Sequence, residues 1–593
     1  MPGSRSLAPT RATLVALVAF AALAVAAPSA PAQSKVERID ALVSKYHDLN
    51  LFNGAALVAE DGRAIYSRGF GDAVMEFDVP NTPDTRFRIG SVTKQFTAAI
   101  VLQLVEEGRI DLQASITDYL PDYPPAQGDK VTIHHLLTHT SGIPSYTDLP
   151  GFMEGPVREP FTPSDSLLPV FWEMDLEFEP GARWSYNNSG YHILGVIIER
   201  VTGRSYDRVL RERILEPLGL ENTGYDHNAD VVERRALGYV RVPGGFQHAP
   251  YLDTSVPFAA GMLYSTVEDL LIWDQALYGQ GPFRNPETRE LYFTPHVAMS
   301  TADGPHYGYG WMIHDVAVGA DTVHLVEHGG GIFGFTTGFW RLPEERRTII
   351  LIDNTNGSQN DRIMRGILAI LHDQEPEMPR RPIGDALAEV IEDRGIEAAV
   401  AAYHALRDSA PDGYDFGEDQ LNGLGYVYLR RGDVATAIRL FELNVEQFPA
   451  ASNPYDSLGE AYLEAGDHER AVANYRRSLE LNPANDNARR ILAQRLGVEV
   501  EVAVFEVPDE TLDSYLGRYE LQPGFVIEIT RDEEGIAAQA TAQPRFPLVA
   551  ISATEFAVRG VDARLAFHRN GADMAESLTL YQGGREAVAP RIE

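Results

Sequence analysis

The chain has 593 residues, 44% of them hydrophobic, and carries a formal net charge of −35 at pH 7. Its length predicts several domains, its composition excludes a collagen or a wholly disordered chain, and its acidity argues against a nucleic-acid partner. The chain has no cysteine, which excludes disulfides and thiolate nucleophiles. Lysine is rare and occurs at Lys35, Lys45, Lys94 and Lys130.

Residues 1–32 have the pattern of an export signal peptide. Arg5 and Arg11 precede an apolar run from Leu14 to Ala27, and a small-residue cleavage pattern ends at Ala32. A membrane anchor is the alternative, but the run is short for the hydrocarbon core of a bilayer. We therefore expect a periplasmic or secreted protein without a membrane span in the mature chain.

Residues 33–375 combine strand patterns at both ends with a helical middle. The periodicity predicts a helix at 36–46, a hairpin of strands 54–59 and 64–67 around Asp61-Gly62, a helix from Ser91, helices and loops over 136–277, strands at 323–326, 335–341 and 348–353, and a helix at 363–371. This order is typical of an α+β unit with one antiparallel sheet, flanking helices and a helical subdomain.

The start of the second predicted helix carries a candidate nucleophile. Ser91 and Lys94 are three residues apart, nearly one helical turn, so the hydroxyl and the ammonium emerge on the same face. The helix N-terminus would supply N–H groups to an acyl oxyanion. By itself a serine here is as well explained as a helix cap.

Two further motifs follow along the chain. Tyr186 and Asn188 could supply a general base, its phenolate favoured by a nearby lysine, and a group that positions lysine and substrate. His328 precedes a glycine run in which Gly330 and Gly331 allow a substrate backbone to approach a strand edge, and the Gly331 amide could be a second oxyanion donor. Taken alone, each motif is better explained by a packed turn.

In this order the three motifs resemble those of serine hydrolases related to class C β-lactamases, D-alanyl carboxypeptidases and family VIII esterases. Other phrases share the resemblance: Phe87-Arg88-Ile89-Gly90, Leu136-Leu137-Thr138-His139-Thr140-Ser141-Gly142, Gly261-Met262-Leu263-Tyr264-Ser265-Thr266 and Tyr307-Gly308-Tyr309-Gly310-Trp311. The resemblance covers about Lys35 to Asp373.

The resemblance implies roles for the matching residues. Ser91 would be the acylated nucleophile, Lys94 and Tyr186 the base pair, and Asn188 a positioning group; which of the two bases takes the serine proton stays open. The oxyanion would be bound by the amides of Ser91 and Gly331. No metal or organic cofactor is required. His139 could suggest a metal site or a triad, but without a second ligand at suitable spacing a structural role is favoured.

One departure bears on the substrate. His328 stands where β-lactamases usually have lysine, and a neutral histidine attracts a β-lactam carboxylate less. We therefore expect an esterase or a D-amino-acid peptidase acting on a small molecule or peptide. The alternatives are a β-lactamase and an inactive hydrolase fold that acts as a scaffold.

Two smaller segments follow a proline-rich linker. Residues 383–497 repeat at an offset of 34, with pairs such as Gly425/Gly459 and Pro449/Pro483, which resembles tetratricopeptide repeats with a groove for a protein or peptide partner. Residues 386–411 are expected to form a degenerate first repeat. Residues 505–593 alternate in short strands, which predicts a small all-β domain.

Overall fold

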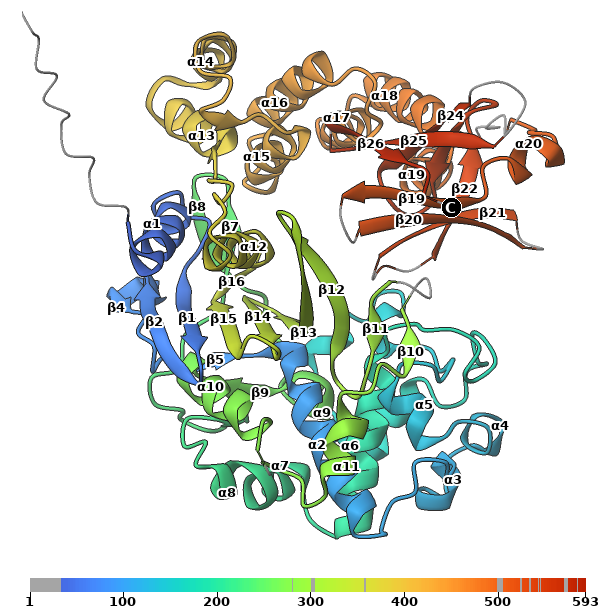
Figure 1. The fold of residues 1–593 in the computed structure, drawn as a ribbon. Coiled ribbons are helices and arrows are strands. Elements are labelled where there is room, and N and C mark those ends of the chain that lie inside the picture. Colours follow the sequence, from blue (N-terminus) through green and yellow to red (C-terminus); the bar gives the residue numbers. More distant parts are fainter. Residues whose placement is uncertain are drawn as a thin grey trace, which may run out of the picture.

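The computed structural model describes residues 33–592 apart from 280, 300–303, 357–358, 499–504, 523–524, 533–534, 542, 544, 570–573 and 584. The expected signal segment, residues 1–32, lies outside this range. Buried apolar side chains form the cores of three parts: an N-terminal unit, a helical segment and a C-terminal barrel. The α+β, repeat and all-β organisation expected from the sequence is confirmed (Figure 1).

An antiparallel sheet of eight strands forms the centre of the N-terminal unit, and chain segments that are far apart in sequence lie side by side in it. In spatial order its strands are β10 (Val297–Ala298), β11 (His306–Tyr307), β12 (Met312–Val318), β13 (Asp321–Ile332), β14 (Phe335–Leu342), β15 (Arg347–Asp353), β1 (Gly54–Glu60) and β2 (Arg63–Phe70). The β1–β2 turn is the predicted one, because Asp61 and Gly62 both have positive φ, 48° and 74°.

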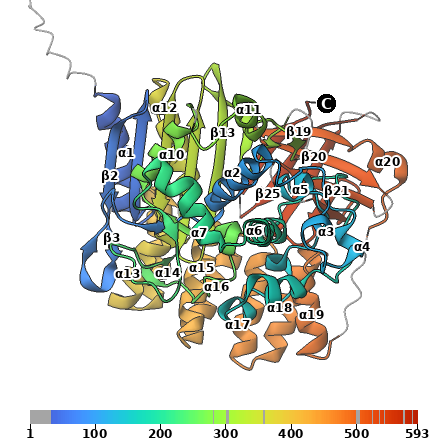
Figure 2. The same cartoon turned by 90° about the horizontal axis from the view of Figure 1, so that it is seen from below.

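Helices cover both faces of this sheet. On one face, α1 (Lys35–Asp48) and α12 (Asn360–Leu371) pack on one core. The other face carries α2 (Thr93–Glu106), which is buried over most of its length, and α10 (Val267–Ala276). Figure 2 shows α2 and α6 seen from below, on the side of the sheet away from α1.

The helical middle of the unit packs against α2. Its helices are α3 (Ile116–Tyr119), α4 (Pro125–Gly128), α5 (Ile133–Leu137), α6 (Asn188–Thr202), α7 (Tyr206–Leu210), α8 (Glu216–Leu218), α9 (Phe258–Gly261) and α11 (Pro286–Tyr292). Short strands complete it: β3 (Asp72–Val74) with β4 (Val79–Pro80), β5 (Phe87–Arg88) with β9 (Leu263–Ser265) and β6 (Gly224–Tyr225), and β16 (Thr355–Asn356) with β7 (Tyr239–Val242) and β8 (Gly245–His248).

The repeat segment is a row of antiparallel helix pairs. Its helices are α13 (Ile383–Arg394), α14 (Ile396–Ser409), α15 (Glu418–Arg430), α16 (Val434–Gln447), α17 (Asn453–Glu464), α18 (His468–Leu481) and α19 (Asp486–Gln494), with a short parallel pair of β17 (Arg381–Pro382) and β18 (Tyr414–Asp415). A helix pair therefore stands where the degenerate first repeat was predicted. A Cβ at Gly425 would lie 2.4 Å from the Phe441 ring, so this repeated glycine allows α15 and α16 to pack closely.

The C-terminal domain is a meander of eight antiparallel strands that nearly closes into a barrel. Its elements are α20 (Asp509–Asp513), β19 (Gly517–Gln522), β20 (Phe525–Asp532), β21 (Gly535–Ala540), β22 (Arg545–Ala550), β23 (Glu555–Val558), β24 (Ala563–Arg569), β25 (Ala575–Gln582) and β26 (Arg585–Pro590). A bridge between Tyr519 and Arg591 joins the first strand to the residues after the last. Aromatic side chains, among them Tyr515, Phe556 and Phe567, fill its interior.

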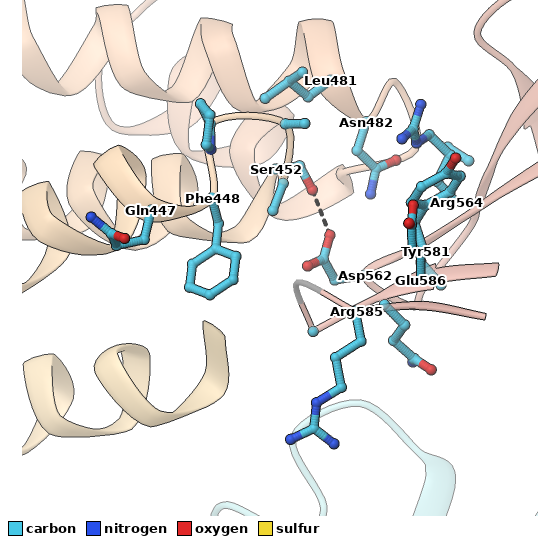
Figure 3. A pocket seen from close by; sticks show the side chains of 17 residues that line it. Gln447, Phe448, Ser452, Leu481, Asn482, Asp562, Arg564, Tyr581, Arg585 and Glu586 are labelled. Atoms are coloured by element: carbon cyan, nitrogen blue, oxygen red, sulfur yellow. Dashed lines mark hydrogen bonds between the residues drawn. The ribbon is translucent and has the colours of Figure 1, made fainter. Parts of the chain in front are cut away.

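Specific contacts join the three parts. Arg241 of β7 pairs with Asp385 of α13, and Arg585 of β26 pairs with Asp415. A pocket of about 380 Å³ lies between the repeats and the barrel, bridged by the hydrogen bond from Ser452 to Asp562 (Figure 3). Both Figure 1 and Figure 2 place the barrel beside the β10–β11 edge of the large sheet, away from β2. Among the described residues, no helix combines the length and hydropathy needed to cross a bilayer.

Candidate active site

Ser91 lies in a 3₁₀ turn, η2 (Gly90–Val92), between β5 and α2. The turn is anchored by the hydrogen bond from Ile89 N to Leu263 O, 2.9 Å, and by the one from Leu263 N to Thr93 Oγ1, 3.1 Å. Gly90 has a φ of +53°, which favours glycine. These constraints place the Ser91 side chain at the N-terminal end of α2.

Lys94 lies one turn further along, fully buried, and its Nζ contacts three oxygen atoms. It lies 3.1 Å from Ser91 Oγ, 2.9 Å from Asn188 Oδ1 and 2.8 Å from the Ala260 carbonyl oxygen. Burial lowers the pKa of Lys94 well below its usual value. The amide and carbonyl oxygens only accept, so a neutral amine that donates to both has its lone pair left for the Ser91 hydroxyl proton.

Tyr186 is brought to the same place by the segment that leads into α6. Lys94 Nζ lies 4.8 Å from the centre of the Tyr186 ring. Burial raises the pKa of Tyr186, and the nearby Ser91 side chain opposes this. The sequence-based expectation that lysine would favour the phenolate is therefore not met, because burial disfavours the charged form of both groups.

Asn188 begins α6, where Asn187 caps the helix by accepting from Gly190 N. Its Oδ1 accepts from Lys94, and its Nδ2 donates to Thr147 Oγ1 over 3.1 Å. The amide is thereby held in one orientation. The contribution of Thr147 was not predicted from the sequence.

The glycine run of β13 lies against the Ser91 turn. Strand β12 pairs with β13 only as far as Glu327, so the last residues of β13 present a free edge there. A Cβ at Gly330 would lie 2.0 Å from Ile89 O and 3.2 Å from Ser91 N. A Cβ at Gly90 would lie 2.9 Å from Gly331 N, so this amide faces the same turn.

A cavity of about 430 Å³ opens at Ser91. It is walled by Ser91, Asn188, Gly331, Tyr146, Thr147, Met153, Val157, Leu252, Val256, Pro257, Ala260, Gly261, Ile332, Phe333, Phe335, Thr336 and Asn356. None of these described lining residues is charged. The wall suits a neutral, largely apolar group beside the nucleophile.

His328 does not line this cavity. The side chain is 1% exposed, its Nδ1 donates to Gly329 O over 2.6 Å, and its Nε2 accepts from the Tyr307 hydroxyl over 2.9 Å. Burial, and then the nearby Lys94, lower the pKa of His328 to about 3. The imidazole is therefore neutral near pH 7, and direct substrate contact by His328 or Gly330 stays a prediction.

Sequence reasoning assigned Ser91 and Asn188 as neighbours of Lys94, but not its third contact or the partner of His328. The Ala260 carbonyl oxygen and Tyr307 fill these places. The family-like motifs pointed to both places, because Ala260 directly precedes the motif that begins at Gly261 and Tyr307 begins a second motif. Within the described part of the chain, no group of three or more His, Asp or Glu residues is arranged to hold a metal ion.

Comparisons with known proteins show the family to which the chain belongs. Residues 39–374 match the family model for Beta-lactamase, and residues 420–484 match the model for Tetratricopeptide repeat. The chain belongs to the β-lactamase family of serine hydrolases. The first match covers the α+β unit that carries Ser91, and the second confirms the repeats.

Relatives of this β-lactamase-family chain carry different names. Penicillin-binding protein 4* of Bacillus subtilis (strain 168) is 30% identical over 368 residues, which are 59% of this chain and 79% of that protein. Esterase EstB of Burkholderia gladioli is 30% identical over 364 residues, 54% of this chain and 91% of the esterase.

One solved structure resembles nearly the whole chain in fold. The octameric penicillin-binding protein homologue from Pyrococcus abyssi covers 94% of this chain and all of its own, at 22% identity and a TM-score of 0.50. Because a penicillin-binding protein and an esterase both match the hydrolase unit, the substrate has to be inferred from the site.

Proposed function

We propose that the protein is an exported serine hydrolase that cleaves an ester or a D-amino-acid amide or peptide through an acyl-enzyme on Ser91. The observation that carries the proposal is the contact set of Lys94, whose Nζ reaches Ser91 Oγ while an amide oxygen and a carbonyl oxygen occupy its other two sides. Such an arrangement supplies both a nucleophile and the base that activates it.

Acylation would proceed with Lys94 as the base. Neutral Lys94 accepts the Ser91 proton as Oγ attacks the substrate carbonyl carbon, and the oxyanion is bound by the amides of Ser91 and Gly331. As the tetrahedral intermediate collapses, the proton passes through the Tyr186 hydroxyl to the leaving alcohol or amine. This assignment is supported by burial, which lowers the pKa of Lys94 and raises that of Tyr186 and so favours the neutral amine and the protonated phenol.

Deacylation would reverse these roles. A water molecule attacks the ester carbonyl of acyl-Ser91 and passes its proton to the Lys94–Tyr186 pair. The Ser91 oxygen leaves and regains that proton, which releases the acid product and restores the resting site. Asn188 holds Lys94 throughout through its Oδ1.

The cavity favours an uncharged acyl group. Its described lining lacks a cation, and His328 is neutral, buried and hydrogen-bonded to Tyr307, so no described residue of the wall offers a carboxylate the attraction of a lysine. This observation supports an esterase or amidase over a β-lactamase. The repeats would bind a protein or peptide partner.

A substrate panel tests the proposal. Wild-type protein and Ser91→Ala are assayed with a p-nitrophenyl ester, a D-alanyl-D-alanine peptide and nitrocefin, and both are treated with a fluorophosphonate. We expect turnover of the ester or the peptide and labelling at Ser91, each lost in Ser91→Ala. Folded wild-type protein that is neither labelled nor active would favour the scaffold alternative, and nitrocefin as the best substrate would contradict the inference from His328.

A further inference from the structure

One residue holds the backbone on both sides of Tyr186. The carbonyl oxygen of His139 accepts from Ser185 N over 2.8 Å, and its imidazole Nδ1 accepts from Asn187 N over 3.0 Å. These are the two neighbours of Tyr186 in the chain. His139 therefore brackets the tyrosine with two hydrogen bonds from a single position.

The imidazole also packs directly on the tyrosine ring. The ring centroids of His139 and Tyr186 are 4.4 Å apart with an interplanar angle of 41°. Tyr307 and Tyr191 lie at 4.6 Å and 5.1 Å from the same imidazole. Since His139 is fully buried among these aromatic rings, its imidazole holds a fixed place against one side of the Tyr186 ring.

The hydrogen bonds of His139 suit a residue that holds a neighbouring segment better than one that transfers protons. Because Nδ1 accepts from a backbone N–H, the neutral ring carries its proton on Nε2, and Nε2 has no hydrogen-bond partner among the described residues. Burial, and then Lys94 and His328, hold the pKa of His139 well below its usual range. The ring thus keeps one protonation state while the site works.

The backbone of His139 is strained in a way that suits this role. Its φ is +59°, a left-handed conformation that is unfavourable for a non-glycine residue. In this conformation the carbonyl oxygen and the imidazole reach the same neighbouring segment. Strain of this kind persists where the surrounding structure holds it, often at active sites.

We propose that His139 is a positioning residue that fixes Tyr186 beside Ser91. The inference rests on the proposed function, in which Tyr186 passes the proton to the leaving group. In this role His139 neither binds a metal nor transfers a proton. The role requires a hydrogen-bond acceptor at the Nδ1 position, which keeps the Asn187 amide and the neighbouring Tyr186 phenol in place.

Two variants separate positioning from general packing. His139→Asn keeps an acceptor at the Nδ1 position and tolerates the left-handed backbone, whereas His139→Gln moves the acceptor towards the Nε2 position. With the best ester substrate, we expect His139→Gln to lower kcat about 100-fold with little change in KM, because a misplaced group costs on this order. His139→Asn should stay within about tenfold of wild type, since acceptor and backbone are kept.

Thermal unfolding and ¹⁵N spectra of histidine-labelled protein complete the test. A purely structural role would lower Tm in both variants and leave kcat per folded molecule unchanged, which would overturn the proposal, as would equal loss of kcat in both. The spectra of wild type, assigned by the signal missing from His139→Asn, should show an unprotonated Nδ1 from pH 5 to 9, and a protonated Nδ1 would also overturn it.

The two proposals fail in different ways. Wild-type protein that neither turns over substrate nor labels at Ser91 contradicts the proposed function, whatever the variants do. Active wild-type protein whose His139→Gln variant keeps full kcat contradicts only the positioning role. If His139→Gln does not fold, the protonation of Nδ1 in wild type decides between the outcomes.

Discussion

Lys94 is the single residue whose surroundings decide the chemistry. The three groups that contact its Nζ are neutral, and its side chain is fully buried, so the ammonium form is disfavoured. The same burial disfavours the Tyr186 phenolate. Burial therefore favours the neutral amine and the protonated phenol, which are the two forms that the proposed acylation uses.

This account predicts an acid limb in the pH profile that belongs to Lys94. The neutral amine is the active form, so kcat/KM should fall as pH drops through the lowered pKa of Lys94 and stay level above it. Lys94→Arg, which cannot be deprotonated at working pH, should lose about 10²–10⁴-fold in kcat/KM at every pH. Ester hydrolysis measured from pH 4 to 9 checks this, and an arginine variant with wild-type activity would exclude lysine as the base.

At the scale of elements, the contact between β13 and the Ser91 turn makes the site. The turn and the strand approach so closely that a Cβ at Gly330 would overlap Ile89 O, at 2.0 Å, whereas the nearest atom to a Cβ at Gly329 is Thr337 O at 3.7 Å. Neighbouring glycines on one strand therefore differ in what they allow. Of these two glycines, only Gly330 must lack a side chain for β13 to lie this close to the Ser91 turn.

The two glycines give a matched pair of variants. Gly330→Ala should push β13 from the turn, lower the free energy of unfolding by about 1–3 kcal/mol and reduce acylation sharply, because the oxyanion donors separate. Gly329→Ala should fold and acylate nearly as wild type. Urea unfolding and the rate of fluorophosphonate labelling measure both effects, and equal behaviour of the two variants would show that the approach of β13 is not needed.

The elements differ in how well the sequence predicts them. The helices around 36–46 and 363–371 and the strands β1, β14 and β15 follow from apolar periodicity, and the β1–β2 turn follows from Asp61-Gly62. Strand β21, in contrast, reads Gly-Ile-Ala-Ala-Gln-Ala, which has little β propensity. It forms because β20 and β22 pair with it on both sides, and such neighbours are not visible in a local pattern.

The sequence predicts which residues form the site, but not the protonation state that burial favours for Tyr186. Ser91, Lys94, Tyr186 and Asn188 converge as the motif order suggested. The direction of the pKa shift of Tyr186 depends on burial by residues such as His139, which lie far from it in sequence. The hydrogen-bond partner of His328 Nε2 is also distant in sequence from the glycine motif, because it is the Tyr307 hydroxyl.

At the scale of the whole molecule, contacts tie the hydrolase unit, the repeats and the barrel together. Arg241 pairs with Asp385, each side chain 14% exposed, and Asp385 also accepts from Gly244 N over 3.0 Å. On the other side of the molecule, Gln539 of the barrel donates to Met299 O over 3.4 Å, and Met299 packs with Trp184 and Tyr307 near the active site. The barrel therefore contacts the cluster of Trp184, Met299 and Tyr307, against which Tyr186 packs.

The contact at Asp385 can be tested with a control on the same helix. Asp385→Ala leaves the Arg241 guanidinium without its carboxylate and should cost about 1–3 kcal/mol at this interface. Trypsin should then cut faster after Arg380 while ester hydrolysis persists. Asp393→Ala removes an exposed pair with Arg394 and should leave the cleavage rate unchanged. Equal cleavage of the two variants would show that the Arg241 pair does not hold the repeats to the hydrolase unit.

The most direct measurement of the central claim is mass spectrometry of protein quenched in acid during turnover of a p-nitrophenyl ester. The proposed mechanism predicts an acyl group on the peptide that contains Ser91, which disappears as substrate is exhausted and is absent from Ser91→Ala. An acyl group carried by another residue, or turnover by Ser91→Ala at the wild-type rate, would contradict it.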